Sequence, residues 1–127
     1  MTRAVERLIE QGLLDDAAFA ESFTRAKVLG AQQSRRRVQQ DLARKGVARE
    51  VSDAAIAAVF EDEQVDQREI VERAARKKIV SLRKLDPTVR RRRLYAFLAR
   101  RGYDSEDIRA AMDSVGEALR GGEDVEE

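Results

Sequence analysis

The sequence contains no cysteine and no histidine, and its only aromatic residues are four phenylalanines and two tyrosines among 127 positions. Without Cys and His, the chain cannot form a Cys/His zinc site, a thiol nucleophile or a Ser-His-Asp triad. It also has no glycine-rich phosphate loop and no recognisable pair of catalytic carboxylates. We therefore predict no active site, cofactor or metal, and a protein that is not an enzyme.

Long apolar runs are missing as well. No segment approaches the roughly 20 apolar residues that a membrane span needs, and no signal-peptide region is recognisable at the start. We expect a cytoplasmic protein.

Charge is abundant and unevenly placed. The 25 basic and 24 acidic residues give a net charge of +1. The segment from Arg73 to Arg101, however, contains 12 basic residues and a single acidic one, Asp86. Residues 120–127 hold four acids and one basic residue, Arg120, and we expect them to form a disordered tail. The segregation predicts a basic surface for an anionic partner.

The composition favours an all-α fold. Ala, Leu, Glu, Arg and Gln dominate, and β-hairpin signals are missing. Gly12, Gly46 and Gly102 each precede an apolar residue, which predicts helix stops. Asp15 and Asp16 would then cap the next helix. We predict helices over residues 3–11, 16–29, 34–45, 49–61, 66–82, 87–101 and 105–119.

A repeat underlies this order. The run Arg35 to Val47 recurs at an offset of 56 as Arg91 to Tyr103, and Phe19 to Lys27 matches Ile70 to Lys78 at an offset of 51. This predicts tandem three-helix repeats at 15–62 and 63–119. Residues 1–14 would be the last helix of an incomplete earlier repeat. Because each repeat has few large apolar residues, the repeats should stack into an elongated, curved, solenoid-like array.

The middle helix of each repeat predicts a basic face. On a helical wheel, Val38 and Leu42 share one side, and Arg36, Arg37 and Arg44 crowd the other. Such a face could bind a nucleic-acid backbone or an acidic protein surface. The alternative is a solvated face neutralised by i,i+4 pairs. The aromatic residues have core spacing, and Tyr95 alone is a candidate surface contact.

Three segments together resemble the RecX family: Leu8 to Ala20, Arg35 to Val47, and Phe97 to Tyr103. The resemblance implies tandem three-helix repeats and a regulator that binds RecA filaments on single-stranded DNA. It would inhibit recombinase, ATPase and SOS co-protease activities. The implied partner-binding residues are Arg25, Lys27, Arg35, Arg36, Arg37, Arg44, Lys45, Lys77, Lys78, Arg92, Arg93, Arg100 and Arg101.

Two other interpretations stay open. The same arginines could make the chain an independent DNA- or RNA-binding protein. If RecA is the partner, a weak direct contact with the DNA of the filament is also possible. A structural scaffold is the third possibility, which the segregated charge disfavours. In each case we expect a monomer.

Overall fold

The computed structural model describes residues 2–120, and every regular element in that range is a helix. The long helix α1 (Thr2–Arg25) ends in a π-helical turn, η1 (Ala26–Gly30). Then follow α2 (Arg35–Arg44), α3 (Arg49–Asp62), α4 (Gln67–Ser81), α5 (Pro87–Arg100), α6 (Ser105–Ser114) and the short α7 (Gly116–Leu119). The all-α prediction is confirmed, and the four central helices agree with prediction to within one residue at each end.

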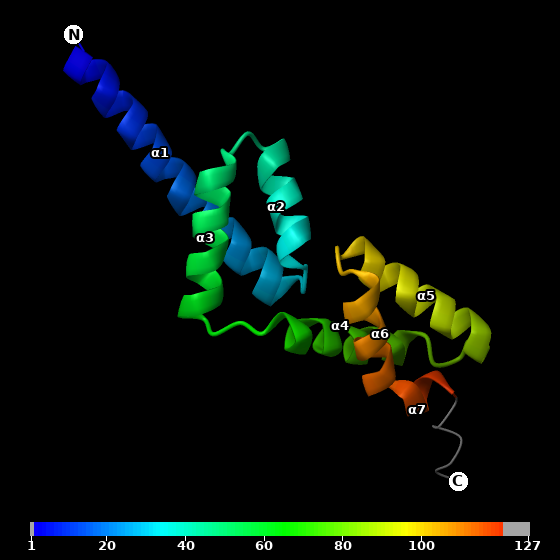
Figure 1. Cartoon of the computed structure of the whole chain (residues 1–127). Coiled ribbons are helices and arrows are strands. Elements are labelled where there is room, and N and C mark those ends of the chain that lie inside the picture. Colours follow the sequence, from blue (N-terminus) through cyan, green and yellow to red (C-terminus); the bar gives the residue numbers. More distant parts are fainter. Residues whose placement is uncertain (1, 121–127) are drawn as a thin grey trace.

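The helices form two units (Figure 1). In the first unit, the second half of α1 packs with α2 and α3. In the second unit, α4 packs with α5 and α6, and α7 closes the end. Val38 and Leu42 of α2 and Leu94 and Leu98 of α5 are completely buried, as the wheel predicted. The solenoid-like stacking and the repeat boundaries stay predictions, and residues 121–127, which hold most of the predicted tail, lie outside the described residues.

The helix stops at Gly46 and Gly102 are confirmed. Both glycines have a positive φ, +88° and +96°, a backbone conformation that residues with a side chain rarely adopt. The residue after each one is buried and donates its backbone N–H to the preceding helix: Val47 to the Leu42 carbonyl and Tyr103 to the Leu98 carbonyl.

Three local predictions are wrong. Gly12 does not stop a helix, because α1 runs through it and no other part of residues 2–120 packs around residues 4–15 to fold the chain back. Asp15 and Asp16 therefore lie within α1 and cap nothing. The helix predicted over 105–119 is broken at Val115, whose φ of −116° leaves the helical region just before Gly116.

Two side chains also differ from expectation. Phe19, assigned to the core, is 44% exposed, since it lies where α1 leaves the first unit. Arg90, in the basic run, is not on the surface: its guanidinium is buried and donates to backbone carbonyls of Arg83, Leu85, Ala118 and Leu119. Arg90 thereby ties the α4–α5 loop and α7 to the start of α5.

The two units are joined by hydrogen bonds around Ser34. Its backbone N–H donates to the Arg101 carbonyl at 2.9 Å, and its hydroxyl donates to the Gly102 carbonyl at 2.7 Å. The same hydroxyl accepts the Arg37 N–H at 3.1 Å and so caps α2. The Tyr103 hydroxyl donates to the Gln32 carbonyl at 2.9 Å. Together these hydrogen bonds fix the start of α2 against the end of α5.

Tyr103 gives this junction a pH dependence. Burial, with a smaller contribution from the Asp107 charge, raises the pKa of the Tyr103 phenol well above its usual range. The stability that the neutral phenol supplies is therefore complete below pH 10, where unfolded tyrosine titrates, and is lost as the pH rises above it. We expect urea unfolding to show about 1.4 kcal/mol less stability per pH unit above pH 10, relative to Tyr103→Phe. If the free energy of unfolding fell equally steeply with pH above pH 10 in the parent and in Tyr103→Phe, the Tyr103 phenol would not be buried.

Candidate functional site

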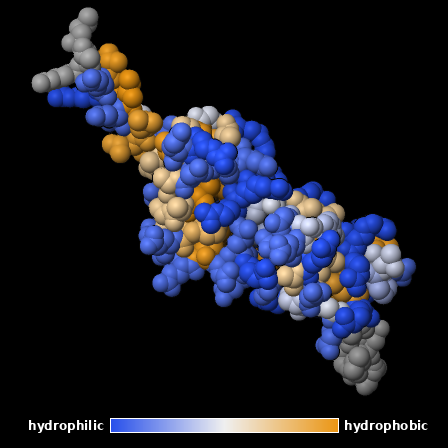
Figure 2. Space-filling model, viewed as in Figure 1, coloured by the Kyte–Doolittle hydropathy of each residue, from blue (hydrophilic) through white to orange (hydrophobic). Residues whose placement is uncertain are grey.

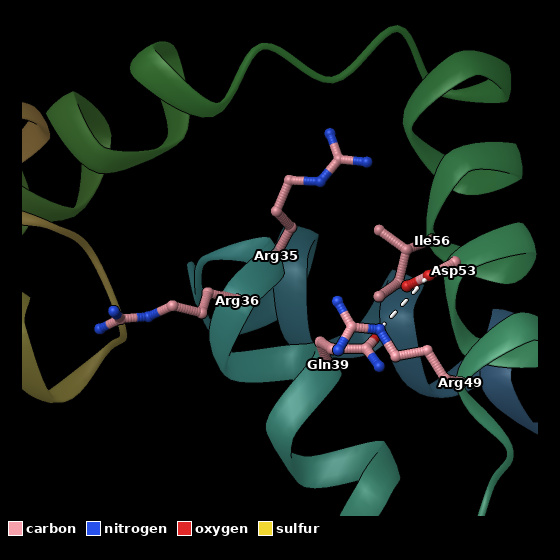
Figure 3. Close-up of a pocket in the computed structure, with 6 residues that line it drawn as sticks. All are labelled: Arg35, Arg36, Gln39, Arg49, Asp53 and Ile56. Carbon is pink, nitrogen blue, oxygen red and sulfur yellow. Dashed lines mark ion pairs between the residues drawn. The ribbon is translucent and has the colours of Figure 1, made fainter.

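The three arginines that begin α2 point in three directions. The Arg35 guanidinium lies 4.4 Å from the centre of the Phe60 ring on α3. Arg37 pairs with Asp41 at 3.3 Å and donates to the Arg100 carbonyl of the second unit. Figure 3 shows Arg35 and Arg36 diverging beside an open hollow of about 300 Å³ that Gln39, Arg49 and Asp53 also line. The arginine run therefore does not form one continuous face, because successive helical residues lie 100° apart.

A cationic cluster does form around Phe97, near the junction of the two units. Lys78 Nζ lies 5.0 Å and the Arg101 guanidinium 4.7 Å from the centre of the Phe97 ring. Both distances suit cation–π attraction. Phe97, Arg100 and Arg101 also line a hollow of about 370 Å³ with Gln33 and Arg37 of the first unit. This Phe97 cluster (Phe97, Lys78, Arg101) thus borders a pocket built by both units.

A matching cluster lies in the first unit. Lys27 Nζ and Lys45 Nζ are each 5.5 Å from the centre of the Phe23 ring. The repeat offsets carry Lys27 onto Lys78 and Lys45 onto Arg101. The rings, however, come from different helices: Phe23 from α1 and Phe97 from α5. In each unit an aromatic ring thus lies near equivalent cations, but the ring is supplied by a different helix.

The Phe23 cluster (Phe23, Lys27, Lys45) adjoins Gln33 and α2, and Gln33 and Arg37 line the pocket shared with the second unit. Asp41 binds both Arg37, at 3.3 Å, and Arg44, at 3.2 Å. The Gln33 N–H donates to the Lys27 carbonyl at 2.9 Å. Arg93, one turn before Phe97 on α5, lines a hollow of about 470 Å³ with Lys78. We define the basic track by its cations: Lys27, Arg37, Arg44, Lys45, Lys78, Arg93, Arg100 and Arg101.

Two buried polar atoms at the pocket between the units have no hydrogen-bond partner among the described residues. They are Gln33 Oε1, in a residue that is 9% exposed, and Arg101 Nε. Buried polar atoms are normally satisfied by protein or water. Both residues line the pocket between the units.

The other predicted contact residues are not joined to the track by any described contact. Arg25 pairs with Glu63 at 3.1 Å, and Arg35 is stacked on Phe60. Arg36, Lys77 and Arg92 are exposed.

Sequence reasoning missed Phe23, Gln33 and Phe97 as part of the site, since the phenylalanines were assigned to the core. Both rings are only half-buried. A usable signal was present: Phe23 precedes Lys27 by four residues, and Phe97 precedes Arg101 by four. That spacing places the two side chains on the same helix face.

Residues 2–120 contain neither a membrane-spanning helix nor a metal-binding cluster of side chains. No helix in this range is both long and apolar enough to span a membrane. No group of three or more acidic side chains in the same range is placed to hold a metal ion.

Comparison with known proteins decides the family. Residues 15–56 match the model of the second three-helix domain of RecX, and residues 66–112 match that of the third. The regulatory protein RecX of Chlorobium phaeobacteroides is 33% identical over 113 residues, which cover 89% of this chain and 70% of that protein. The chain belongs to the RecX family.

Other RecX proteins give the same picture. Identity is 35% over 123 residues with RecX of Mycobacterium sp. (strain JLS), covering 95% of the chain and 65% of the relative. RecX of Mycolicibacterium smegmatis is 37% identical over 107 residues, which cover 80% of this chain and 55% of that protein. The chain thus spans between 55% and 70% of the length of these three relatives. No solved structure matches it significantly.

RecX is a family of regulatory proteins, which is consistent with regulation of RecA. Within the RecX domains, the basic track divides evenly. Lys27, Arg37, Arg44 and Lys45 lie in the second domain, and Lys78, Arg93, Arg100 and Arg101 lie in the third. The pocket between the units is where the two halves of the track meet.

Proposed function

We propose that this chain binds RecA filaments on single-stranded DNA through the basic track and inhibits their recombinase, ATPase and co-protease activities. It acts in the cytoplasm as a non-enzymatic regulator. The observation that carries the proposal is the pair of cation–aromatic clusters, one in each RecX domain, whose cations occupy repeat-equivalent positions. A filament is itself a repeating surface, so a repeated cationic site can contact successive parts of it.

Charge supports this assignment. The track has eight cations. In the described ion pairs, the acid that binds track residues is Asp41, whose side chain is only 14% exposed. An ion pair with Asp41 leaves Arg44 65% exposed, so its guanidinium can still reach a partner. Arginine forks fit carboxylates and phosphates equally well. A filament of protein on DNA offers both groups.

Rigidity supports it too. The Ser34 and Tyr103 hydrogen bonds hold the two domains together before any partner arrives. A binder whose contacts are already positioned loses less entropy on association. Several weak contacts on one rigid body then act together, and their combined affinity far exceeds that of either cluster.

The alternative function is direct binding of DNA or RNA without RecA. The half-buried Phe23 and Phe97 rings favour it to some degree, because aromatic side chains between cations can stack nucleobases. Here, however, the described cations already lie against the rings, which leaves less ring surface for a base.

Co-sedimentation separates the two functions. The chain is mixed with RecA filaments on single-stranded DNA, with the same DNA alone, and with RecA alone, all at one salt concentration. We expect it to sediment with filaments at concentrations at which it leaves bare DNA unbound. Equal or tighter binding to bare DNA would favour the alternative. Salt dependence does not discriminate, since both interfaces are electrostatic.

A further inference from the structure

The loop between α4 and α5 borders a hollow of about 470 Å³ that has cationic and apolar lining but no acid. Its cationic lining residues are Lys78, Arg83, Lys84 and Arg93. Its apolar lining residues are Val80, Leu82 and Leu85, of which Val80 is 56% exposed. Figure 2 shows small orange areas set among blue ones on the second unit, at the end away from α1. We call this hollow the basic hollow.

The cations of the basic hollow are not neutralised within residues 2–120, where no described ion pair includes any of them. Arg83, Lys84 and Arg93 are exposed, and Lys78 is half-buried beside the Phe97 ring. A concave surface lined by charges of one sign concentrates counter-ions. The basic hollow therefore favours a ligand that has several carboxylates, and its apolar lining favours one that also has an apolar side chain.

A neighbouring hollow of about 580 Å³, beside α7, differs in charge. Asp113 and Glu117 line it together with Arg76 and Arg120. These acids repel a carboxylate ligand, so an acidic segment near α7 should prefer the basic hollow.

Arg90 holds the end of α7 beside the basic hollow. Its buried guanidinium donates to the Leu119 carbonyl at 3.3 Å, and to the carbonyls of Arg83 and Leu85 at 3.1 and 2.7 Å. Arg83 and Leu85 both line the hollow. The chain that follows α7 therefore starts next to this lining.

That following segment has the matching composition. Residues 121–127, which lie outside the described residues, have the sequence Gly-Gly-Glu-Asp-Val-Glu-Glu. The two glycines allow the chain to turn after α7. Four acids then surround one apolar residue, Val125. Seven extended residues span up to about 24 Å, which is more than enough to cross a hollow of about 470 Å³.

We propose that residues 123–127 bind in the basic hollow of the same chain, with their carboxylates at its cations and Val125 against its apolar lining. Lys78 and Arg93 of the hollow also belong to the basic track. The bound segment therefore competes with the partner of the track for these two cations. The binding stands by itself, whereas the competition rests on the proposed function.

The binding is tested by NMR on the full chain. Because the chain has no cysteine, a nitroxide spin label can be attached at Glu127→Cys alone, which leaves three of the four acids in place. At low salt, we expect the label to broaden the amide signals of residues 83–85 and 93 more than those of residues 113–117. At about 1 M salt, where charges are screened beyond about 3 Å, this difference should disappear.

Two matched variants assign the contact. Arg83→Gln with Lys84→Gln removes two exposed cations of the hollow that lie outside the basic track, and should lower the ratio of bound to free segment about tenfold. Arg73→Gln with Arg109→Gln removes the same charge from exposed positions away from the hollow, and should leave that ratio unchanged.

Three results would overturn the binding. They are equal broadening around the two hollows, equal losses in the two variants, and broadening between chains when spin-labelled protein is mixed with isotope-labelled protein that has no spin label. The last result would place the segment in the hollow of a second copy.

Inhibition of RecA tests the competition. The variant Glu123→Gln, Asp124→Asn, Glu126→Gln, Glu127→Gln should inhibit ATP hydrolysis at a concentration at least about twofold lower than the parent, because the bound fraction of the parent is not competent to bind. An unchanged concentration would overturn the competition and leave the NMR result valid. If neither protein inhibits RecA, the proposed function is wrong, and the NMR comparison still decides whether the segment binds.

Discussion

Reversing three exposed cations of the basic track, in the variant Lys45→Glu, Arg93→Glu, Arg100→Glu, is expected to weaken inhibition of RecA by about 10² to 10³-fold. Each exposed ion pair contributes up to about 1 kcal/mol, and reversal replaces that attraction with a similar repulsion. Three sites then remove about 3–4 kcal/mol of binding free energy. The measurement is the concentration of chain that halves ATP hydrolysis by RecA on single-stranded DNA.

A second triple variant controls for net charge. Arg73, Arg76 and Arg109 are exposed and lie outside the basic track. Changing all three to Glu alters net charge by the same amount and should change inhibition only a few-fold. Circular dichroism and melting temperature of both variants should stay close to those of the parent, because all six side chains are exposed. If the control variant loses as much activity as the track variant, the interaction depends on net charge and not on the track.

The second large effect concerns stability and compares two glycines. Gly46→Ala and Gly102→Ala both place a Cβ on a residue with positive φ, which costs about 1–2 kcal/mol. At Gly46 the new atom meets nothing within 4 Å. At Gly102 it collides with Ser34 Oγ and Arg37 Cβ, at the hydrogen bonds that join the two domains. Overpacking of that kind adds about 1–3 kcal/mol.

Urea unfolding should therefore show a loss of about 1–2 kcal/mol for Gly46→Ala and about 2–5 kcal/mol for Gly102→Ala. The extra loss should appear as faster amide exchange around residues 32–37 and 100–103, and as weaker inhibition of RecA. Equal losses at the two glycines would show that the Ser34 junction does not hold the domains together.

The helices and the repeat could be predicted from sequence because their signals are local. Helix propensity, apolar spacing and glycine stops are read within a few residues, and α2 to α5 follow them closely. The Gly12 stop failed although its local signal equals that at Gly46. A helix turns back at such a glycine only when the following segment packs against it, and residues 4–15 are exposed along the part of the chain that the structure describes.

The site was less predictable because it depends on which side chains meet across helices. The run Arg35 to Arg37 suggested one face, but its members divide between Phe60, solvent and the junction. Phe97 was assigned to the core because its spacing is apolar. Only the packing of α4 against α5 brings Lys78 to that ring and turns a half-buried phenylalanine into part of a cationic cluster.

Titration of RecA with this chain tests the central claim most directly. ATP hydrolysis by RecA from the same organism is followed on single-stranded DNA, and binding of the chain to the same DNA without RecA is measured in parallel. The account predicts that hydrolysis is inhibited at chain concentrations far below those that bind bare DNA. Unchanged hydrolysis at concentrations that saturate bare DNA would contradict it and identify the chain as an independent nucleic-acid-binding protein.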